Sequence, residues 1–308
     1  MRIAVVGAGA MGSLFGGKLS TVAQVTLLDP WAEHVVAMQS DGLHIIELDG
    51  TETSIPVTAT TDPAAVPNVD LAIIFVKSHA TRQASRWADR FLAPDGLALT
   101  LQNGVGNADM MSEVLGADRV VGGVTSHGAT LLGPGHVRHA GKGPTHIATR
   151  PDMAKKLSDL ATVLEQAGFE VHLSDSLEDL VWGKLLINVG INALTAILRV
   201  PNGQLVEIPA ASALMDQAVA EAEAVCRAKG ISLPFDNPLG RVREVARATA
   251  ANRSSMLQDV LRGVPTEIGV INEVIVHEGQ RLGIATPVNR LIVTTIRAIE
   301  GSYAARVN

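Results

Sequence analysis

The spacing of the apolar residues changes near residue 174. Before it, short runs rich in Val, Ile, Leu and Ala alternate with stretches of helical periodicity, and continuous apolar runs are typical of strands buried on both faces of a parallel sheet. After it, the pattern is helical almost throughout. We therefore predict an α/β protein in which a Rossmann-type dinucleotide-binding domain over 1–174 precedes an all-α domain over 175–308.

The elements of the two predicted domains follow from these runs and their breaks. In the first domain, strands are predicted over 2–6, 24–28, 70–76, 97–101, 119–123 and 169–173, with further strands in 137–149 and a helix over 153–168. In the second domain, helices are predicted over 179–198, 210–229, 238–251, 266–282 and 288–302.

The stretch from Asp179 to Leu198 is apolar almost all the way round a helical wheel, which is typical of a buried helix. It nevertheless carries Lys184, Asn188 and Asn192 at intervals of four, so they lie within about 80° of one another around the helix. Burying an ammonium and two amides is unfavourable unless each finds partners. Two interpretations stay open: a structural or solvent-facing polar stripe, and a wall of a binding cleft with Lys184 directed at a polar ligand.

A glycine-rich turn follows the first predicted strand. It consists of Gly7, Ala8, Gly9, Ala10, Met11 and Gly12. A helix pattern and a second strand follow, and that strand ends at Asp29, about 20 residues after Gly9, as the dinucleotide-binding fingerprint requires. In this fingerprint the glycines let the backbone approach a pyrophosphate at a helix N-terminus.

The acidic residue at the end of the second strand also bears on the choice of cofactor. A carboxylate at Asp29 can accept hydrogen bonds from ribose hydroxyls and would repel a 2′-phosphate. No Arg or Lys lies between Leu27 and Gln39 to receive that phosphate. NAD is therefore the preferred cofactor, and NADP remains an alternative because Lys77 or a distant arginine could reach it.

Two further polar residues follow predicted strands. Lys77 comes after the strand over 70–76, and Asn103 comes after the strand over 97–101. Ligands of open α/β sheets bind at the carboxyl ends of strands, so both residues are candidates for contact with the cofactor, and Asn103 also for contact with the substrate. An exposed loop lysine and a plain turn are the alternatives.

Composition excludes several classes of function. The net charge is −6 and aromatic residues make up 3% of the 308 residues, which argues against nucleic-acid binding. No uncharged run reaches the length of a membrane span, and the single cysteine, Cys226, suits a reducing compartment, so we expect a cytoplasmic protein. No metal site is expected, because the spacings of the four histidines at 127, 136, 139 and 146 fit hairpin strands better than a ligand set.

At these motifs the sequence resembles the ketopantoate reductases (2-dehydropantoate 2-reductases) along nearly its whole length. The specific segments are WGKLLINVGINALTAI, VPNG at 200–203, NRSSMLQDVLRGVPTEIGVINEVI at 252–275 and QNGVG at 102–106. The resemblance implies reduction of 2-dehydropantoate to (R)-pantoate in pantothenate biosynthesis. It also implies a helical domain like the C-terminal domain of 6-phosphogluconate dehydrogenase. The expected assembly is a homodimer.

The resemblance also assigns roles to individual residues. It implies that Lys184 donates the proton and that Glu267 belongs to the catalytic site and binds substrate. The implied substrate-binding residues are Asn103, Lys184, Asn188, Asn192, Asn252, Ser255 and Glu267. From the residues alone, a helix cap is the alternative for Ser255, and a surface helix carboxylate is the alternative for Glu267.

One departure from the family pattern keeps other functions open. NADP-using members carry an arginine at the end of the second strand, where this chain has Asp29. An NAD-dependent D-2-hydroxyacid dehydrogenase acting on another branched or aromatic 2-oxoacid is therefore the main alternative. A non-catalytic sensor of NAD(P) is a minor one, disfavoured because a sensor does not need Lys184 and Glu267 together.

Overall fold

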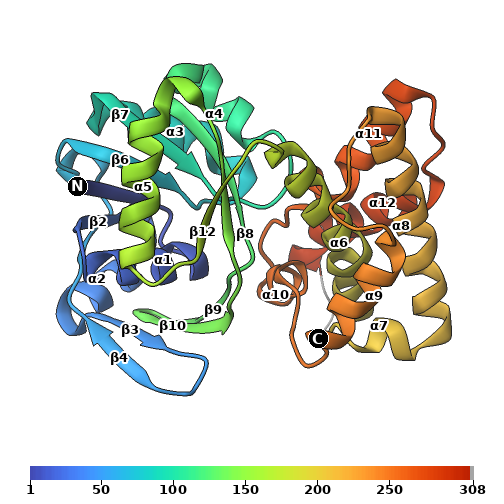
Figure 1. The fold of residues 1–308 in the computed structure, drawn as a ribbon. Helices are drawn as coiled ribbons and strands as arrows, with labels where there is room; N and C mark the ends of the chain where they lie inside the picture. Colours follow the sequence, from blue (N-terminus) through green and yellow to red (C-terminus); the bar gives the residue numbers. More distant parts are fainter. Residues whose placement is uncertain (306–308) are drawn as a thin grey trace. The chain divides into compact units, whose positions relative to one another are not determined.

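The computed structural model describes residues 1–305. Contacts within the chain divide it into two units (Figure 1). The N-terminal unit comprises Met1–Gln102 and Gly106–Leu177, and the helical unit comprises Asn103–Val105 and the chain from Glu178 onward. The turn after Gln102 therefore belongs by its contacts to the helical unit, although it lies within the sequence of the N-terminal one.

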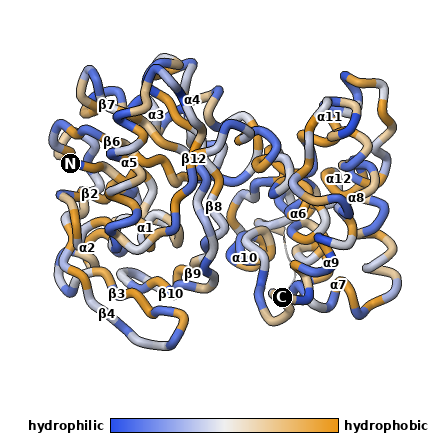
Figure 2. Tube along the Cα trace, in the orientation of Figure 1, coloured by the Kyte–Doolittle hydropathy of each residue, from blue (hydrophilic) through white to orange (hydrophobic). Residues whose placement is uncertain are grey.

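An eight-stranded sheet forms the centre of the N-terminal unit, in the order β12-β11-β8-β7-β6-β1-β2-β5. Its strands are β1 (Arg2–Val6), β2 (Gln24–Leu28), β5 (Thr58–Thr60), β6 (Val69–Ile74), β7 (Leu92–Thr100), β8 (Val120–Thr125), β11 (Thr145–Ala148) and β12 (Val171–Ser174). All neighbouring strands are parallel except β8 and β11. Figure 2 shows apolar residues along β2 and β6, as expected of strands covered on both faces.

Helices cover both faces of this sheet (Figure 1). They are α1 (Ala10–Ser20), α2 (Ala32–Asp41), α3 (Thr81–Phe91), α4 (Asn107–Leu115) and α5 (Ala154–Gln166). Alternate residues of β1 face opposite sides: Ile3 and Val5 join the core with α1 and α5, whereas Ala4 and Val6 join the core with α3 and α4. The predicted fold class is confirmed in this unit.

A second sheet of four strands also belongs to the N-terminal unit, in the order β4-β3-β10-β9. Its strands are β3 (Leu43–Ile46), β4 (Glu52–Ile55), β9 (Gly128–Gly133) and β10 (His136–Gly141). β3 and β10 pair in parallel, with His44 opposite His136. The predicted strands of 137–149 therefore divide between two sheets, a pairing that a local pattern does not reveal.

The helical unit is built around α6 (Leu177–Leu198), which covers the apolar stretch of the sequence. Its other helices are α7 (Gln204–Glu207), α8 (Pro209–Lys229), α9 (Pro238–Ala248), α10 (Ser255–Arg262), α11 (Asn272–Leu282) and α12 (Pro287–Gly301). Within the described residues, α6 is the one helix long and apolar enough to cross a membrane. However, 67% of its most apolar window is buried inside the protein, as is typical of a core helix.

One predicted helix of this unit begins six residues too early, and two short helices were not predicted. The helix predicted over 266–282 begins only at Asn272, and a 3₁₀ turn over Ile268–Val270 precedes it. Thr266 and Glu267 lie in the irregular segment before that turn, where the hydroxyl of Thr266 accepts a hydrogen bond from the Ile268 N–H at 3.2 Å. Helices α7 and α10 were not among the predicted helices.

Candidate active site

The glycine-rich turn of the N-terminal unit joins β1 to α1 and is shaped by the protein's own backbone. Gly7 has φ +93°, and a Cβ there would lie 2.8 Å from the backbone N of Val76. A Cβ on Gly12 would lie 1.8 Å from the carbonyl oxygen of Gly7. Both positions therefore exclude a side chain.

Gly9 differs from these two glycines, because a Cβ there would meet nothing within 4 Å. Gly9 lies immediately before α1, whose first N–H groups are free of intrahelical partners. The open space at this helix N-terminus fits the pyrophosphate of a dinucleotide, and no acidic residue in the first turn of α1 would repel it.

Asp29 lies against this turn at the end of β2. Its Oδ2 accepts a hydrogen bond from the Ala8 N–H at 2.7 Å, and its Oδ1 accepts one from the Trp31 N–H at 2.9 Å. A carboxylate has about four acceptor sites, so two sites are left for ribose hydroxyls. Lys77, partly exposed, follows β6, and β6 pairs with β1 so that Ile74 lies opposite Val6. The structure thus brings the ends of β1, β2 and β6 to one edge of the sheet.

The predicted polar stripe lies on α6 in the helical unit. Lys184 and Asn188 are partly exposed, and Asn192 is 7% exposed. Among the described residues, Nδ2 of Asn188 is buried without a hydrogen-bond partner. A buried amide donor left without a partner costs about 1–3 kcal/mol, which is unusual for a purely structural stripe.

Lys184 and Glu267 interact electrostatically in this unit. Burial lowers the pKa of Lys184 to about 8, and the negative charge of Glu267 opposes that shift. Glu267 is itself 6% exposed and lies before a 3₁₀ turn, so the alternative of a carboxylate on a surface helix does not apply. A lysine with a pKa near neutral pH can both hold and release a proton under physiological conditions.

Asn103 lies close to the segment of Glu267. Its neighbour Gly104 has φ +86°, and a Cβ there would lie 2.5 Å from the carbonyl oxygen of Val270. The Gln-Asn-Gly turn is therefore packed directly on the 3₁₀ turn that follows Glu267. The contact explains why Asn103–Val105 belongs to the helical unit, and it brings two of the predicted substrate residues into neighbouring segments.

The adjacent serines at 254 and 255 have separate surroundings. Ser254 is the N-cap of α10, where its Oγ accepts a hydrogen bond from the Leu257 N–H at 3.1 Å and lies 2.7 Å from Oγ1 of Thr195 on α6. Ser255 is the first residue of the helix and stays partly exposed. The helix-cap alternative therefore applies to Ser254 and not to Ser255, and no local pattern of residues indicates the contact with Thr195.

The start of α10 also shows where Asn252 lies. Ser254 Oγ is 3.4 Å from the backbone carbonyl of Asn192, so the turn that precedes α10 lies beside the second half of α6. Asn252 is exposed, and its backbone carbonyl accepts a hydrogen bond from the Asn202 N–H at 3.0 Å.

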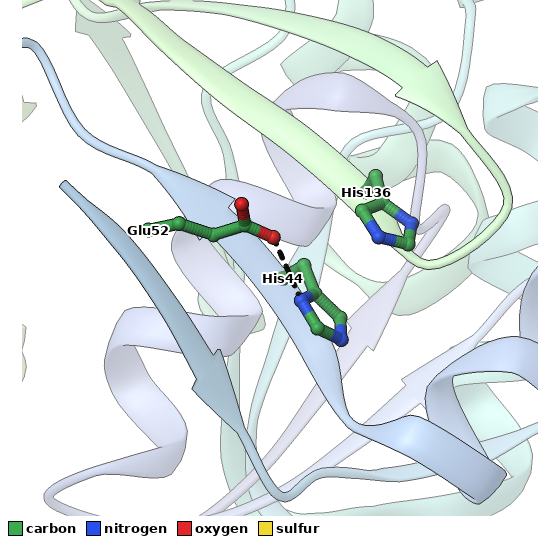
Figure 3. Close-up of side chains that lie close together, drawn as sticks. All are labelled: His44, Glu52 and His136. Carbon is green, nitrogen blue, oxygen red and sulfur yellow. Dashed lines mark hydrogen bonds and ion pairs between the residues drawn. The ribbon is translucent and has the colours of Figure 1, made fainter. Parts of the chain in front are cut away.

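The four histidines considered as a metal cluster are separated into three places. His127 pairs with His139 at 3.0 Å in the interior, and His146 lies beside His172. His136 lies beside His44 and Glu52 on the small sheet, and ligand atoms of these three residues lie within 4.8 Å of one another (Figure 3).

The group of His44, Glu52 and His136 is explained by its own hydrogen bonds. Nδ1 of His44 pairs with Glu52 at 2.9 Å, and Nδ1 of His136 pairs with the carbonyl of Pro134 at 2.9 Å. The two rings are stacked 4.4 Å apart with planes only 16° from parallel. Since nitrogen lone pairs lie in the ring planes, an ion about 2.0–2.1 Å from both rings requires the rings to turn first.

A nucleophilic cysteine is excluded by the surroundings of Cys226. The thiol is buried in α8, and burial raises its pKa to about 12. Reactive cysteines are partly exposed and have a lowered pKa, so Cys226 is a packing residue.

Comparison with known proteins relates both units to one family. Residues 3–152 match the family described as Ketopantoate reductase PanE/ApbA, and residues 176–300 match Ketopantoate reductase PanE/ApbA C terminal. A curated 2-dehydropantoate 2-reductase of Halobacterium salinarum is 39% identical over 96% of this chain and 98% of its own length.

Two solved structures are similar over nearly the whole of both chains. A PanE/ApbA family ketopantoate reductase from Ralstonia eutropha JMP134 has a TM-score of 0.90 and 36% identity, and covers 99% of this chain and 100% of its own. D-mandelate dehydrogenase with NADH and anilino(oxo)acetate has a TM-score of 0.91 and 28% identity, with the same coverage. On the two family matches and these near full-length relatives, the chain belongs to the ketopantoate reductase family.

Proposed function

We propose that this protein reduces 2-dehydropantoate to (R)-pantoate with a reduced nicotinamide dinucleotide, a step of pantothenate biosynthesis. The observation that carries the proposal is the pair of Lys184 and Glu267, in which burial lowers the pKa of the lysine to about 8 against the opposing charge of Glu267. The named activity of the relatives supports the choice of substrate.

Lys184 is the proposed general acid. The cofactor supplies the hydride, and its addition to the carbonyl carbon builds negative charge on the oxygen. The Nζ–H of Lys184 donates to that oxygen and stabilises the charge while it forms. Glu267 favours the ammonium form of Lys184 and also accepts a hydrogen bond from a hydroxyl of the substrate.

Amide and hydroxyl groups are the proposed binding partners of the remaining substrate oxygens. They belong to Asn103, Asn188, Asn192, Asn252 and Ser255. The unpartnered Nδ2 of Asn188 supports this assignment, because a substrate oxygen would supply the missing acceptor. Site-directed removal of each donor, with KM as the readout, tests the set.

For the cofactor, we propose NAD in preference to NADP. The pyrophosphate would bind at the turn Gly7–Gly12 and the ribose hydroxyls would bind to Asp29, while Lys77 would approach the cofactor from the end of β6. The NADH in the related D-mandelate dehydrogenase supports a nicotinamide dinucleotide. Ratios of kcat/KM for NADH and NADPH, measured for the wild type and for Asp29→Arg, test the preference. It fails if the wild type favours NADPH.

A second candidate is reduction of an aromatic or another branched 2-oxoacid. D-mandelate dehydrogenase, with its aromatic substrate, has 28% identity and a TM-score of 0.91 with this chain. A panel containing 2-dehydropantoate, phenylglyoxylate and branched 2-oxoacids, followed by nicotinamide absorbance, separates the candidates by kcat/KM. Tight cofactor binding without turnover of any 2-oxoacid would support the sensor instead.

The location and assembly of the enzyme are also proposals. The buried free thiol of Cys226 and the burial of α6 support a cytoplasmic protein. A homodimer is the proposed assembly. Light scattering tests it directly, since a dimer would have twice the chain mass of 32.2 kDa.

A further inference from the structure

Trp31 combines an exposed indole with a fixed position beside Asp29. The residue is 37% exposed, whereas Trp182 is 1% exposed and Trp87 is only partly exposed. It also occupies the N-cap of α2 without a side-chain capping bond, a position that favours Ser, Thr, Asp or Asn. A residue that breaks a local rule and leaves its apolar surface in water is typical of a functional position.

The hydrogen bonds around Trp31 tie it to the glycine-rich turn. Its N–H donates to Oδ1 of Asp29 at 2.9 Å, and Oδ2 of the same carboxylate accepts from the Ala8 N–H at 2.7 Å. One carboxylate thus sets the distance between the turn that would bind the pyrophosphate and the backbone of Trp31.

The indole is supported on one face by His34. The two rings are stacked with centroids 5.2 Å apart and planes 19° from parallel. His34 is fully buried and held at both nitrogens: Nδ1 accepts from the Gly135 N–H at 2.8 Å, so Nε2 carries the proton that it donates to the Ala8 carbonyl at 2.8 Å. Burial lowers the pKa of His34, so its ring is a neutral support.

We propose that the outward face of Trp31 is the platform on which the adenine ring of the dinucleotide stacks. The proposal rests on the proposed NAD-dependent function. If Asp29 binds the ribose hydroxyls, the adenine is attached to that same ribose and must lie close to the carboxylate. Trp31 is bonded to that carboxylate and presents a flat, preoriented aromatic face. Stacking of a base on an aromatic side chain typically changes affinity by about 5- to 100-fold.

Quenching of tryptophan fluorescence by AMP and by ADP-ribose tests the platform directly, because neither ligand carries the nicotinamide that absorbs indole emission. In the wild type and in the control Trp87→Phe, we expect emission to fall on saturation with either ligand. In Trp31→Phe we expect the quench to disappear while calorimetry still finds ADP-ribose binding, because Phe also stacks. In Trp31→Ala we expect ADP-ribose affinity to fall about 5- to 100-fold, with nicotinamide mononucleotide affinity unchanged.

Several outcomes would overturn the platform. They are a full quench in Trp31→Phe, wild-type ADP-ribose affinity in Trp31→Ala, and an equal loss of affinity for ADP-ribose and nicotinamide mononucleotide in Trp31→Ala. Failure of the underlying function looks different, because the wild type itself would then bind none of these ligands. Should Trp31→Ala not fold by circular dichroism, the Trp31→Phe quench and affinity decide the question.

Discussion

The two units present polar groups to their proposed ligands in opposite ways. In the N-terminal unit the turn Gly7–Gly12 offers backbone N–H groups, and the polar side chains beside it, Asp29 and His34, are already paired within the protein. In the helical unit the site consists of side chains on α6, where Lys184 has a lowered pKa and Nδ2 of Asn188 has no partner within the described chain.

This difference separates binding from chemistry. A backbone turn can bind the same phosphate groups in any sequence that folds into it, so it needs only glycines at fixed spacing. Proton transfer needs a side chain whose pKa lies near the working pH, and burial is the means of shifting it. We therefore expect substitutions of the polar side chains of the candidate site in the helical unit to change rates and pH dependence, and substitutions in the N-terminal unit to change cofactor binding and folding.

The largest expected effect is that of Lys184→Ala. Removing a positioned acid typically costs about 10²–10⁴-fold in rate, so kcat should fall by that order while the fold and NADH affinity stay unchanged. Steady-state kinetics, circular dichroism and NADH titration check the three parts. The exposed Lys155→Ala is the matched control and should keep wild-type kcat. A near-normal kcat in Lys184→Ala would show that the polar side chains on α6 have a structural role instead.

The pH dependence of the wild type follows from the same lysine. Only the protonated amine can donate, and its pKa is about 8, so the rate of reduction should fall as pH rises through about 8. A rate of reduction that stays flat up to pH 10 would exclude Lys184 as the acid.

Glu267→Gln should have the next largest effect. The charge of Glu267 raises the pKa of Lys184 against the effect of burial. Without that charge, the rate of reduction should begin to fall at a pH below about 8. Loss of a charged binding partner should also reduce kcat/KM for the 2-oxoacid by about 10- to 100-fold. The exposed Glu207→Gln serves as the control. If the rate of reduction fell at the same pH in Glu267→Gln as in the wild type, the charge of Glu267 would not affect the pKa of Lys184 in the enzyme.

The sequence predicted the N-terminal site better than the helical one, for a physical reason. Strands β1 and β2 were predicted to the residue, and the turn between β1 and α1 follows from glycines that are local in sequence. The pairing of Lys184 with Glu267 joins residues far apart in the chain, and no local period reports it. Only the resemblance to a family connected them.

The errors in the helical unit have the same origin. The helix predicted over 266–282 begins only at Asn272, because Thr266 and Glu267 are held by tertiary contacts, such as the hydrogen bond from the Thr266 N–H to Glu300 Oε1 at 2.7 Å. The packing of Gly104 on Val270 and the bond between Ser254 and Thr195 likewise depend on the fold. Polar residues on one helix can be found from their spacing, whereas their partners on other segments cannot.

A buried histidine of the N-terminal unit should make the free energy of unfolding depend on pH. His127 lies edge-on to Phe15 and Phe169, and burial lowers its pKa to about 4. Its charged neighbours are His139, Lys18, Lys142 and Glu170, and Glu47 pairs with His139 at 2.9 Å.

The sign of the effect follows from linkage. The unfolded His127 has a pKa near 6.5, so between about pH 6.5 and 4 the unfolded state binds more protons and stability falls as pH falls. From pH 7 to 5 the loss should be about 2 kcal/mol. Urea unfolding of the wild type and His127→Gln at both pH values measures it, and an equal loss in the two proteins would contradict the assignment.

The smallest expected effects distinguish two adjacent serines. Ser254 caps α10 and contacts Thr195, so Ser254→Ala should lower the free energy of unfolding by about 1 kcal/mol. Ser255 has no capping bond and is partly exposed at the start of α10, so Ser255→Ala should leave stability unchanged and raise the KM for the 2-oxoacid about 5- to 10-fold. Each variant controls for the other, because both remove one hydroxyl at neighbouring positions. If Ser255→Ala lost stability instead, its hydroxyl would belong to the scaffold of the helical unit, and Ser255 would leave the substrate-binding set.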